Sequence, residues 1–217
     1  MEAFLEKREL VSWSVNEEPH NIDPKKHVRT RTSTVTKSEG NFKTTSEDVL
    51  PDGTRHGKYK KTRDNNGEIK EVTANFKMGK LHGSFLSETI RFGETFFECR
   101  AQFRHGIPNE GIECSSLLFG KVIQRSYLSF RGGFPCSILW GEHIYPIMWG
   151  KNILSLGGEN YKDVSFSDEG EDYEQAVLIL GREFESFEKF SPKVYGTDKE
   201  GRRGRLYIPV FLAESKK

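Results

Sequence analysis

The sequence of 217 residues lacks any long hydrophobic run, and no stretch approaches the roughly 18 to 20 apolar residues that a transmembrane helix requires. Its first residues contain no apolar segment typical of a secretory leader. Its three cysteines form no Cys-x-x-Cys pair, and their odd number argues against a disulfide framework. We therefore expect a cytoplasmic or otherwise intracellular protein, with association to a membrane left open.

An excess of charge of one sign is also missing, since 33 basic residues face 32 acidic residues and the net charge is +1. Composition thus gives no reason to expect nucleic-acid binding. The sequence contains no nucleophile-elbow, zinc-protease, phosphate-loop or dinucleotide-binding motif. We expect no catalytic residues, no metal and no cofactor. An enzymatic site in the C-terminal part, near Trp140–Trp149, stays open as a less favoured alternative.

What the sequence does have is glycine at even intervals. Twenty-one glycines stand against eight prolines, and eight of the glycines follow one another at spacings of 12 to 14 residues. Taken in alternate pairs, these spacings define a two-part unit of 26 to 27 residues, which indicates an internal repeat. The eight are Gly40, Gly53, Gly67, Gly79, Gly93, Gly106, Gly120 and Gly133.

The stretches between these glycines alternate between apolar and polar residues. Thr95, Phe97, Cys99, Ala101 and Phe103 recur at every second position, a period that is typical of a half-buried strand. Glycine at each corner can supply the positive φ of a hairpin turn. We predict nine or more consecutive antiparallel strands, with the repeat-turn glycines being Gly53, Gly57, Gly67, Gly79, Gly83, Gly93, Gly106, Gly120 and Gly133.

The repeated unit aromatic-x-x-Gly-x-x-His-Gly-x-aromatic is most complete from Phe76 to Phe85, where Gly79, His82 and Gly83 hold its fixed positions. It resembles the MORN repeat (membrane occupation and recognition nexus), in the longer-period variant found in bacterial antitoxin-like proteins. The resemblance covers roughly residues 40 to 133. It departs from the common pattern because the period is longer and because the later copies degrade: the copy from Gly106 to Gly111 carries an insertion, and the copy after Gly133 loses the second glycine.

The resemblance implies a mainly β protein with an elongated single-layer antiparallel β-meander of ~27-residue hairpin repeats. It also implies a non-enzymatic scaffold that mediates protein–protein interaction or self-assembly through its sheet. Two alternatives remain: a membrane-proximal phospholipid-binding module, and an antitoxin or immunity-type binder of a cognate toxin. The expected partner is a protein or a second copy, with a possible peripheral membrane contact and no nucleic acid.

The chain divides into three expected segments: N-terminal strands and a loop over residues 1–37, the repeat sheet over 38–150, and a cap over 151–217. The cap contains the one predicted helix, Glu171–Phe190, followed by a final strand over Arg205–Leu212. A stripe at helical spacing should cover the apolar face of the sheet. Its members are Tyr173, Val177, Leu180, Phe184 and Phe187.

One helix cannot cover the whole apolar face of such a sheet. A helix is about 10 Å wide, whereas nine strands span about 43 Å. We expect the uncovered part to form an interaction face, because large exposed apolar patches mark interaction sites. Its candidate residues are Phe76, Phe97, Phe103, Leu118 and Phe130.

Four basic residues on one predicted strand are candidates for contact with an anion or a lipid headgroup, although the alternation divides them between two faces. They are Lys58, Lys60, Lys61 and Arg63.

Two histidines and two cysteines are residue types that could carry chemistry. His56 and His82 occupy equivalent repeat positions, but these lie two strands, or about 9.5 Å, apart. Zinc needs each nitrogen within about 2.1 Å, so we interpret these histidines as turn-flanking residues. Cys99 and Cys114 stand in apolar positions and are interpreted as small buried hydrophobic residues.

Overall fold

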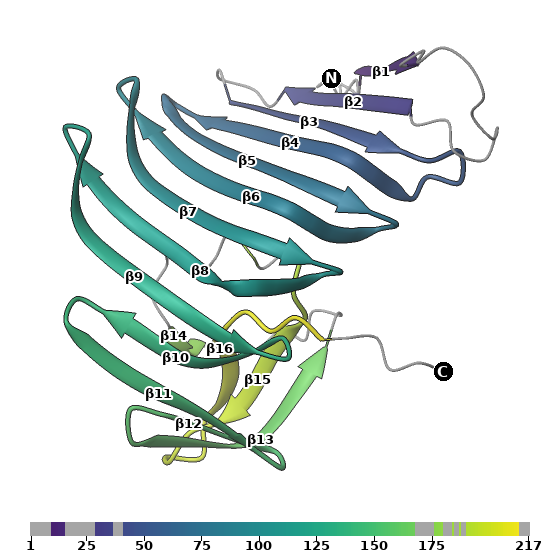
Figure 1. Cartoon of the computed structure of the whole chain (residues 1–217). Coiled ribbons are helices and arrows are strands. Elements are labelled where there is room, and N and C mark those ends of the chain that lie inside the picture. Colours follow the sequence, from purple (N-terminus) through teal and green to yellow (C-terminus); the bar gives the residue numbers. More distant parts are fainter. Residues whose placement is uncertain are drawn as a thin grey trace, which may run out of the picture.

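The computed structural model describes residues 10–15, 29–36, 41–167, 176–179, 184, 187 and 190–212. The chain forms one sixteen-stranded sheet in these parts (Figure 1). Its strands are β1 (Leu10–Val15), β2 (Arg29–Thr36), β3 (Phe42–Val49), β4 (Arg55–Asn65), β5 (Glu68–Lys77), β6 (Lys80–Arg91), β7 (Glu94–Arg104), β8 (Ile107–Leu118), β9 (Lys121–Arg131), β10 (Phe134–Trp140), β11 (His143–Gly150), β12 (Ile153–Leu156), β13 (Glu159–Ser167), β14 (Ala176–Ile179), β15 (Lys193–Thr197) and β16 (Arg203–Tyr207).

Strands β1 to β13 lie side by side in chain order, and each pairs with the next in antiparallel register. The predicted meander of nine or more strands is therefore confirmed. The glycines of the even spacing mark the hairpin turns with positive φ: Gly53, Gly67, Gly79, Gly93, Gly106, Gly120 and Gly133.

Two glycines that the repeat motif assigned to turns lie inside strands instead. Gly57 is within β4 with φ +119, and Gly83 is within β6 with φ +84. Gly83 follows an irregularity in the β5–β6 register between Ala74 and Phe76. Positive φ at an irregular point of a strand is the usual place of a bulge glycine, so these two residues bend their strands and do not reverse the chain.

The alternation along each strand separates a buried face from a solvent face as predicted. In β7, Cys99, Ala101 and Phe103 are buried, whereas Arg100 and Gln102 between them are exposed. Buried side chains of β4 to β13, β15 and β16 form one continuous hydrophobic cluster. The core thus extends along most of the sheet.

The two halves of strand β11 pair with different strands. The first half of β11 pairs with β10, and its second half, from Ile147 to Gly150, pairs with β12. Strand pairing also runs across both predicted segment boundaries, from β2 to β3 and from β11 to β12. Beyond β13 the order becomes β15, β16 and β14, and β14–β16 is the one parallel pair among the described strands.

The predicted helix over Glu171–Phe190 is wrong. Ala176–Ile179 is strand β14, and Phe190 N–H donates to the Phe187 carbonyl oxygen at 2.9 Å, an i to i+3 hydrogen bond that closes a tight turn. The sequence Ala-Val-Leu-Ile is apolar enough to extend the sheet, and Gly181 interrupts the helical pattern. Tyr173 and Leu180 lie outside the described residues.

The covering role predicted for this segment is nevertheless confirmed at Phe184 and Phe187, which are 3% and 0% exposed. The Phe187 ring lies 4.4 Å from that of Phe85 on β6, and the Phe190 ring lies 6.1 Å from that of Tyr59 on β4. The apolar spacing of three to four residues therefore correctly indicated contact with the sheet, but Phe184 and Phe187 lie in 3₁₀ turns and not in an α-helix.

The last described residues complete this cover. The Phe211 ring lies 5.1 Å from that of Phe103 and 5.7 Å from that of Phe130. Phe211 N–H also donates to the Gly133 carbonyl oxygen at 2.8 Å. Phe187, Phe190 and Phe211 together cover the apolar face from β4 to β9, which leaves the solvent face and the strand ends as the accessible surfaces there.

Candidate interaction edge of the sheet

The hairpin turns of an antiparallel meander lie alternately at the two ends of its strands. We use the word edge for each of these two rows of strand ends, and not for the outermost strands. The β6–β7, β8–β9 and β10–β11 hairpins project at the same edge, on the left of Figure 1. Exposed apolar side chains gather at the ends of these three hairpins. We call them the hairpin-tip row: Phe92, Phe96, Leu118, Phe119, Val122, Ile123, Trp140, Ile144 and Tyr145.

Two residues of the hairpin-tip row are highly exposed and also have an unfavourable, left-handed backbone conformation. Phe92 is 101% exposed with φ 53°, and Phe119 is 80% exposed with φ 49°. The glycine that follows each of them also has positive φ, as the type I′ turn requires. Left-handed backbone costs a residue with a Cβ roughly 1–2 kcal/mol. The fold gains nothing evident from phenylalanine at these two positions.

The equivalent turn between β4 and β5, at the same edge, shows what such a turn favours. Asn66 has φ 54° and Gly67 has φ 87° there. Asn-Gly is the preferred pair of a type I′ turn because asparagine tolerates the left-handed region. Phenylalanine before Gly93 and Gly120 therefore departs from turn chemistry, and such departures point to a role other than folding.

Charges are balanced along the hairpin-tip row. Lys121 and Glu142 are exposed on the β8–β9 and β10–β11 hairpins. Arg91 lies with its guanidinium carbon 4.7 Å from the centre of the Phe96 ring and forms an ion pair with Glu68 at 2.6 Å. This edge therefore carries apolar side chains among single charges of both signs.

The predicted interaction face is part of the core. Phe76 and Phe103 are 6% and 4% exposed, and Phe97 and Phe130 are half-buried against the same cluster. The reason is the cover by residues 184–211, which replaces the single helix that was expected. Leu118 is the exception, since it is 49% exposed and belongs to the hairpin-tip row.

The opposite edge is bound to the neighbouring repeat by backbone hydrogen bonds. Gly79 N–H donates to the Arg55 carbonyl oxygen, and Gly106 N–H donates to the Leu81 carbonyl oxygen, both at 2.8 Å. The turn at Gly79 is thereby held by β4, and the turn at Gly106 by β6, so each turn is bound to a strand of the preceding repeat. The glycine spacing fixes this contact because both turns have the same length.

The repeat histidines contribute to the same edge. His56 Nδ1 accepts a hydrogen bond from Met78 N–H at 3.4 Å, and His82 Nδ1 accepts one from His105 N–H at 3.5 Å. The described residues contain no group of three or more side chains placed to hold a metal ion. The histidines therefore connect successive repeats, in agreement with their interpretation as turn-flanking residues.

The cysteine interpretation is correct for burial and wrong for chemical state. Cys99 and Cys114 are 0% and 1% exposed. They face each other directly across β7 and β8 and form a disulfide. The antiparallel register of β7 and β8 places the two thiols side by side. The odd number of cysteines and the lack of a short cysteine motif gave no indication of this pairing. Cys136 is a free cysteine.

The four basic candidates do not form one contact surface. Lys60 forms an ion pair with Glu71 at 3.1 Å, and Arg63 Nε donates to Asn65 at 3.1 Å. In the β4–β5 register, Lys58 and Lys60 face one side of the sheet while Lys61 and Arg63 face the other. This division agrees with the alternation in the sequence.

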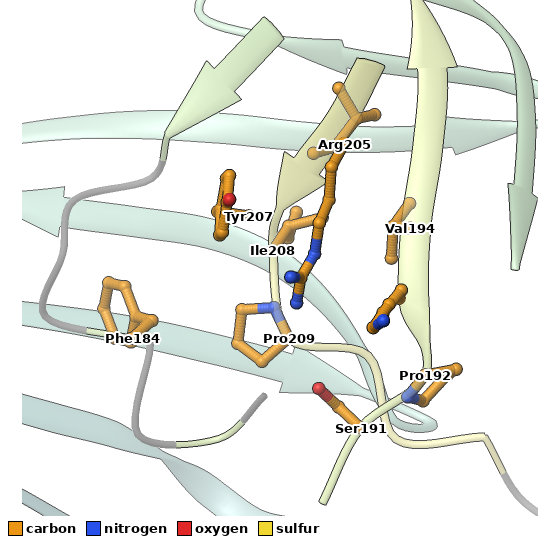
Figure 2. A pocket seen from close by; sticks show the side chains of 10 residues that line it. Phe184, Ser191, Pro192, Val194, Arg205, Tyr207, Ile208 and Pro209 are labelled. Atoms are coloured by element: carbon orange, nitrogen blue, oxygen red, sulfur yellow. The ribbon is translucent and has the colours of Figure 1, made fainter. Parts of the chain in front are cut away.

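The structure contains two hollows whose volumes and lining residues limit what could bind there. The cavity drawn in Figure 2, between Phe184, Val194 and Pro209, has a volume of ≈ 20 Å³, which is room for about one water molecule. Arg205 lies beside it, 4.7 Å from the centre of the Tyr207 ring. The cavity is too small for a substrate.

The second hollow is an open depression of ≈ 430 Å³ on the solvent face of β6 to β9. It is lined by Arg100, Glu110, Glu113 and Tyr127, among others. Burial, and secondarily the charges of Glu110 and Glu113, raise the pKa of Tyr127. The ring of Tyr127 fills the place that a Cβ at Gly111 would occupy, at 2.4 Å. Tyr127 can therefore take this position in the lining because position 111 is glycine.

No protein-family model, no curated protein and no solved structure matches this chain. None of the helices in the described residues is long and apolar enough to cross a membrane.

Sequence reasoning missed the hairpin-tip row, although a signal was present. Phe92 and Phe119 stand directly before Gly93 and Gly120, which are members of the even spacing. A bulky residue at the first central position of a predicted type I′ turn is unusual. Leu118, which flanks the second turn, was assigned to the apolar face of the sheet instead.

Proposed function

We propose that this chain is a non-enzymatic, MORN-like repeat scaffold that binds another protein through the hairpin-tip row. The observation that carries the proposal is the exposure of Phe92 and Phe119, at 101% and 80%, on turns where phenylalanine is unfavourable. Residues that oppose folding and contact no core are retained for what they bind. Aromatic side chains are also enriched in protein interfaces.

The rest of the architecture supports a scaffold. The apolar face is occupied by Phe184, Phe187, Phe190 and Phe211 of the chain itself, so a partner does not need to complete the core. Hydrogen bonds between repeats, such as that from Gly106 to Leu81, hold the hairpins in fixed positions along the sheet. Exposed apolar side chains on a rigid frame can bind with little loss of conformational freedom.

The main alternative is a membrane-proximal phospholipid-binding module. Aromatic hairpin tips suit the headgroup region of a bilayer. Attraction to an anionic surface, however, requires basic residues on the inserting side. Glu94 and Glu142 accompany Arg91 and Lys121 at these tips, so the edge offers no net positive charge. We therefore favour a protein partner; a cognate toxin is one kind of protein that such an edge could bind.

Site-specific photocrosslinking in cells tests this proposal. A benzoyl-phenylalanine at position 119 should form a discrete protein–protein product, because its side chain would lie in the interface. The same group in place of Lys162, an exposed residue of β13 away from these hairpins, is the matched control and should form none. Absence of any product at position 119, or equal products at both positions, would contradict the proposal. Flotation of the purified protein with liposomes, lost in Phe119→Ser, would favour the lipid alternative.

A further inference from the structure

We propose that the partner at the hairpin-tip row is a second copy of this chain, bound about a two-fold axis between the β8–β9 and β10–β11 hairpins. This inference rests on the proposed function and names its partner. The apolar residues of the row are concentrated on these two hairpins, since all except Phe92 and Phe96 belong to them. The two hairpins are neighbours along the edge because β9 and β10 are paired strands.

The charges on these two hairpins determine where the two-fold axis lies. Lys121 is exposed at the end of β8–β9, and Glu142 is exposed at the end of β10–β11. A two-fold axis between the hairpins places Lys121 of each copy opposite Glu142 of the other, so that both pairs are of opposite sign. An axis through either hairpin would bring two like charges together. Only the intermediate axis makes this edge complementary to itself.

The apolar side chains then fall between the two ion pairs. Phe119, Ile123 and Ile144 are 80%, 62% and 69% exposed in the single chain and would be covered in the dimer. Trp140 at the end of β10 pairs with Ser126 on β9, so the β8–β9 hairpin extends about five residues, or roughly 16 Å, beyond the β10–β11 hairpin. Each long hairpin would therefore lie over the short hairpin of the other copy. Two hairpins from each copy form a small interface, so the dimer should dissociate on dilution.

The alternative occupants fit these observations less well. Lys121 and Glu142 cancel in charge, so an anionic bilayer gains no electrostatic attraction from this pair of hairpins. An unrelated protein would have to supply a matching pair of opposite charges at the same spacing. The second copy has that pair already.

The experiment is a charge exchange followed by sedimentation velocity over a dilution series. The wild type should be a dimer at high concentration. Lys121→Glu and Glu142→Lys should each weaken dimerisation by roughly tenfold, because two opposite-charge contacts become like-charge contacts. The double variant should restore it, since the pairs are then reversed. Lys162→Glu on β13 is the control for the change in net charge and should have no effect.

Each other outcome overturns the inference in a recognisable way. A dimer that neither single exchange weakens would place the contact elsewhere on the chain. A wild type that is monomeric at its highest soluble concentration, while position 119 crosslinks to a different protein, would refute the second copy and leave the scaffold proposal standing. A monomer that forms no crosslink would refute both. A monomer that floats with liposomes would assign the edge to lipid.

Discussion

Replacing Gly133 by alanine tests how the C-terminal segment is attached to the sheet. Gly133 has φ +88, and a Cβ there would lie 1.8 Å from the Phe211 carbonyl oxygen, which is backbone and cannot rotate away. The same two residues share a hydrogen bond of 2.8 Å from Phe211 N–H to the Gly133 carbonyl oxygen. The substitution must therefore displace the chain around Phe211.

The size of the effect follows from what this displacement removes. The hydrogen bond contributes about 1 kcal/mol, and complete loss of a buried phenylalanine costs about 3–5 kcal/mol. Phe211 contacts the rings of Phe103, Phe130 and Phe187, and partial separation would forfeit part of that packing. We expect Gly133→Ala to lower the free energy of unfolding by about 2–4 kcal/mol beyond the strain of the turn itself.

Gly120→Ala is the matched control, because Gly120 has φ +71 but a Cβ there would meet nothing within 4 Å. It should cost only the backbone strain, about 1–2 kcal/mol. Urea unfolding followed by tryptophan fluorescence measures both variants. Amide hydrogen exchange at residues 208–211 should accelerate only in Gly133→Ala. Equal destabilisation by the two variants, with unchanged exchange at these residues, would refute the attachment. Should Gly133→Ala fail to fold, Phe211→Leu tests the same contact more gently.

Three further expectations concern local interactions. Reducing the disulfide between Cys99 and Cys114, which closes a loop of 15 residues, should lower the free energy of unfolding by about 3 kcal/mol; a midpoint in urea that is insensitive to reductant would show that the thiols are free. His82→Ala should cost about 0.5–1 kcal/mol through the lost acceptor, and a cost of zero would make this histidine dispensable to the contact between repeats. The hydrogen bond from Arg91 lowers the pKa of Glu68 below its usual 4.5, against the opposing effect of burial. Its contribution to stability is therefore present above that pH and lost as the pH falls through the lowered value, so Glu68→Gln should flatten the acid side of the stability profile.

The turns and strands were predictable because glycine spacing and period-two alternation are local properties. Gly79 and Gly106 occupy the same place in two repeats, and the same backbone hydrogen bond holds each of them. A one-residue change in spacing would move every side chain of a strand to the other face. The sequence therefore specifies the register along with the turns.

The cover and the candidate site were not predictable for two different reasons. Phe184 and Phe187 have the spacing of a helix, but the same spacing serves a turning chain that lies across a sheet. Which of the two forms depends on Phe85 and Phe103, which are far away in the sequence. The tip residue Phe119 was missed because hydrophobic alternation assigns apolar residues to a buried face and has no place for one at a turn.

The most direct test of the central claim is to replace Phe119 by asparagine and to measure folding stability and association together. Asparagine before Gly120 restores the preferred type I′ pair, which Asn66-Gly67 already uses at the same edge. Met78→Asn is the control, because Met78 has φ 50° and is 60% exposed at the opposite edge. We predict that both variants gain about 1 kcal/mol in the free energy of unfolding and that only Phe119→Asn loses association. Unchanged association in Phe119→Asn, or equal loss in both variants, would contradict the claim that the hairpin-tip row is the binding surface.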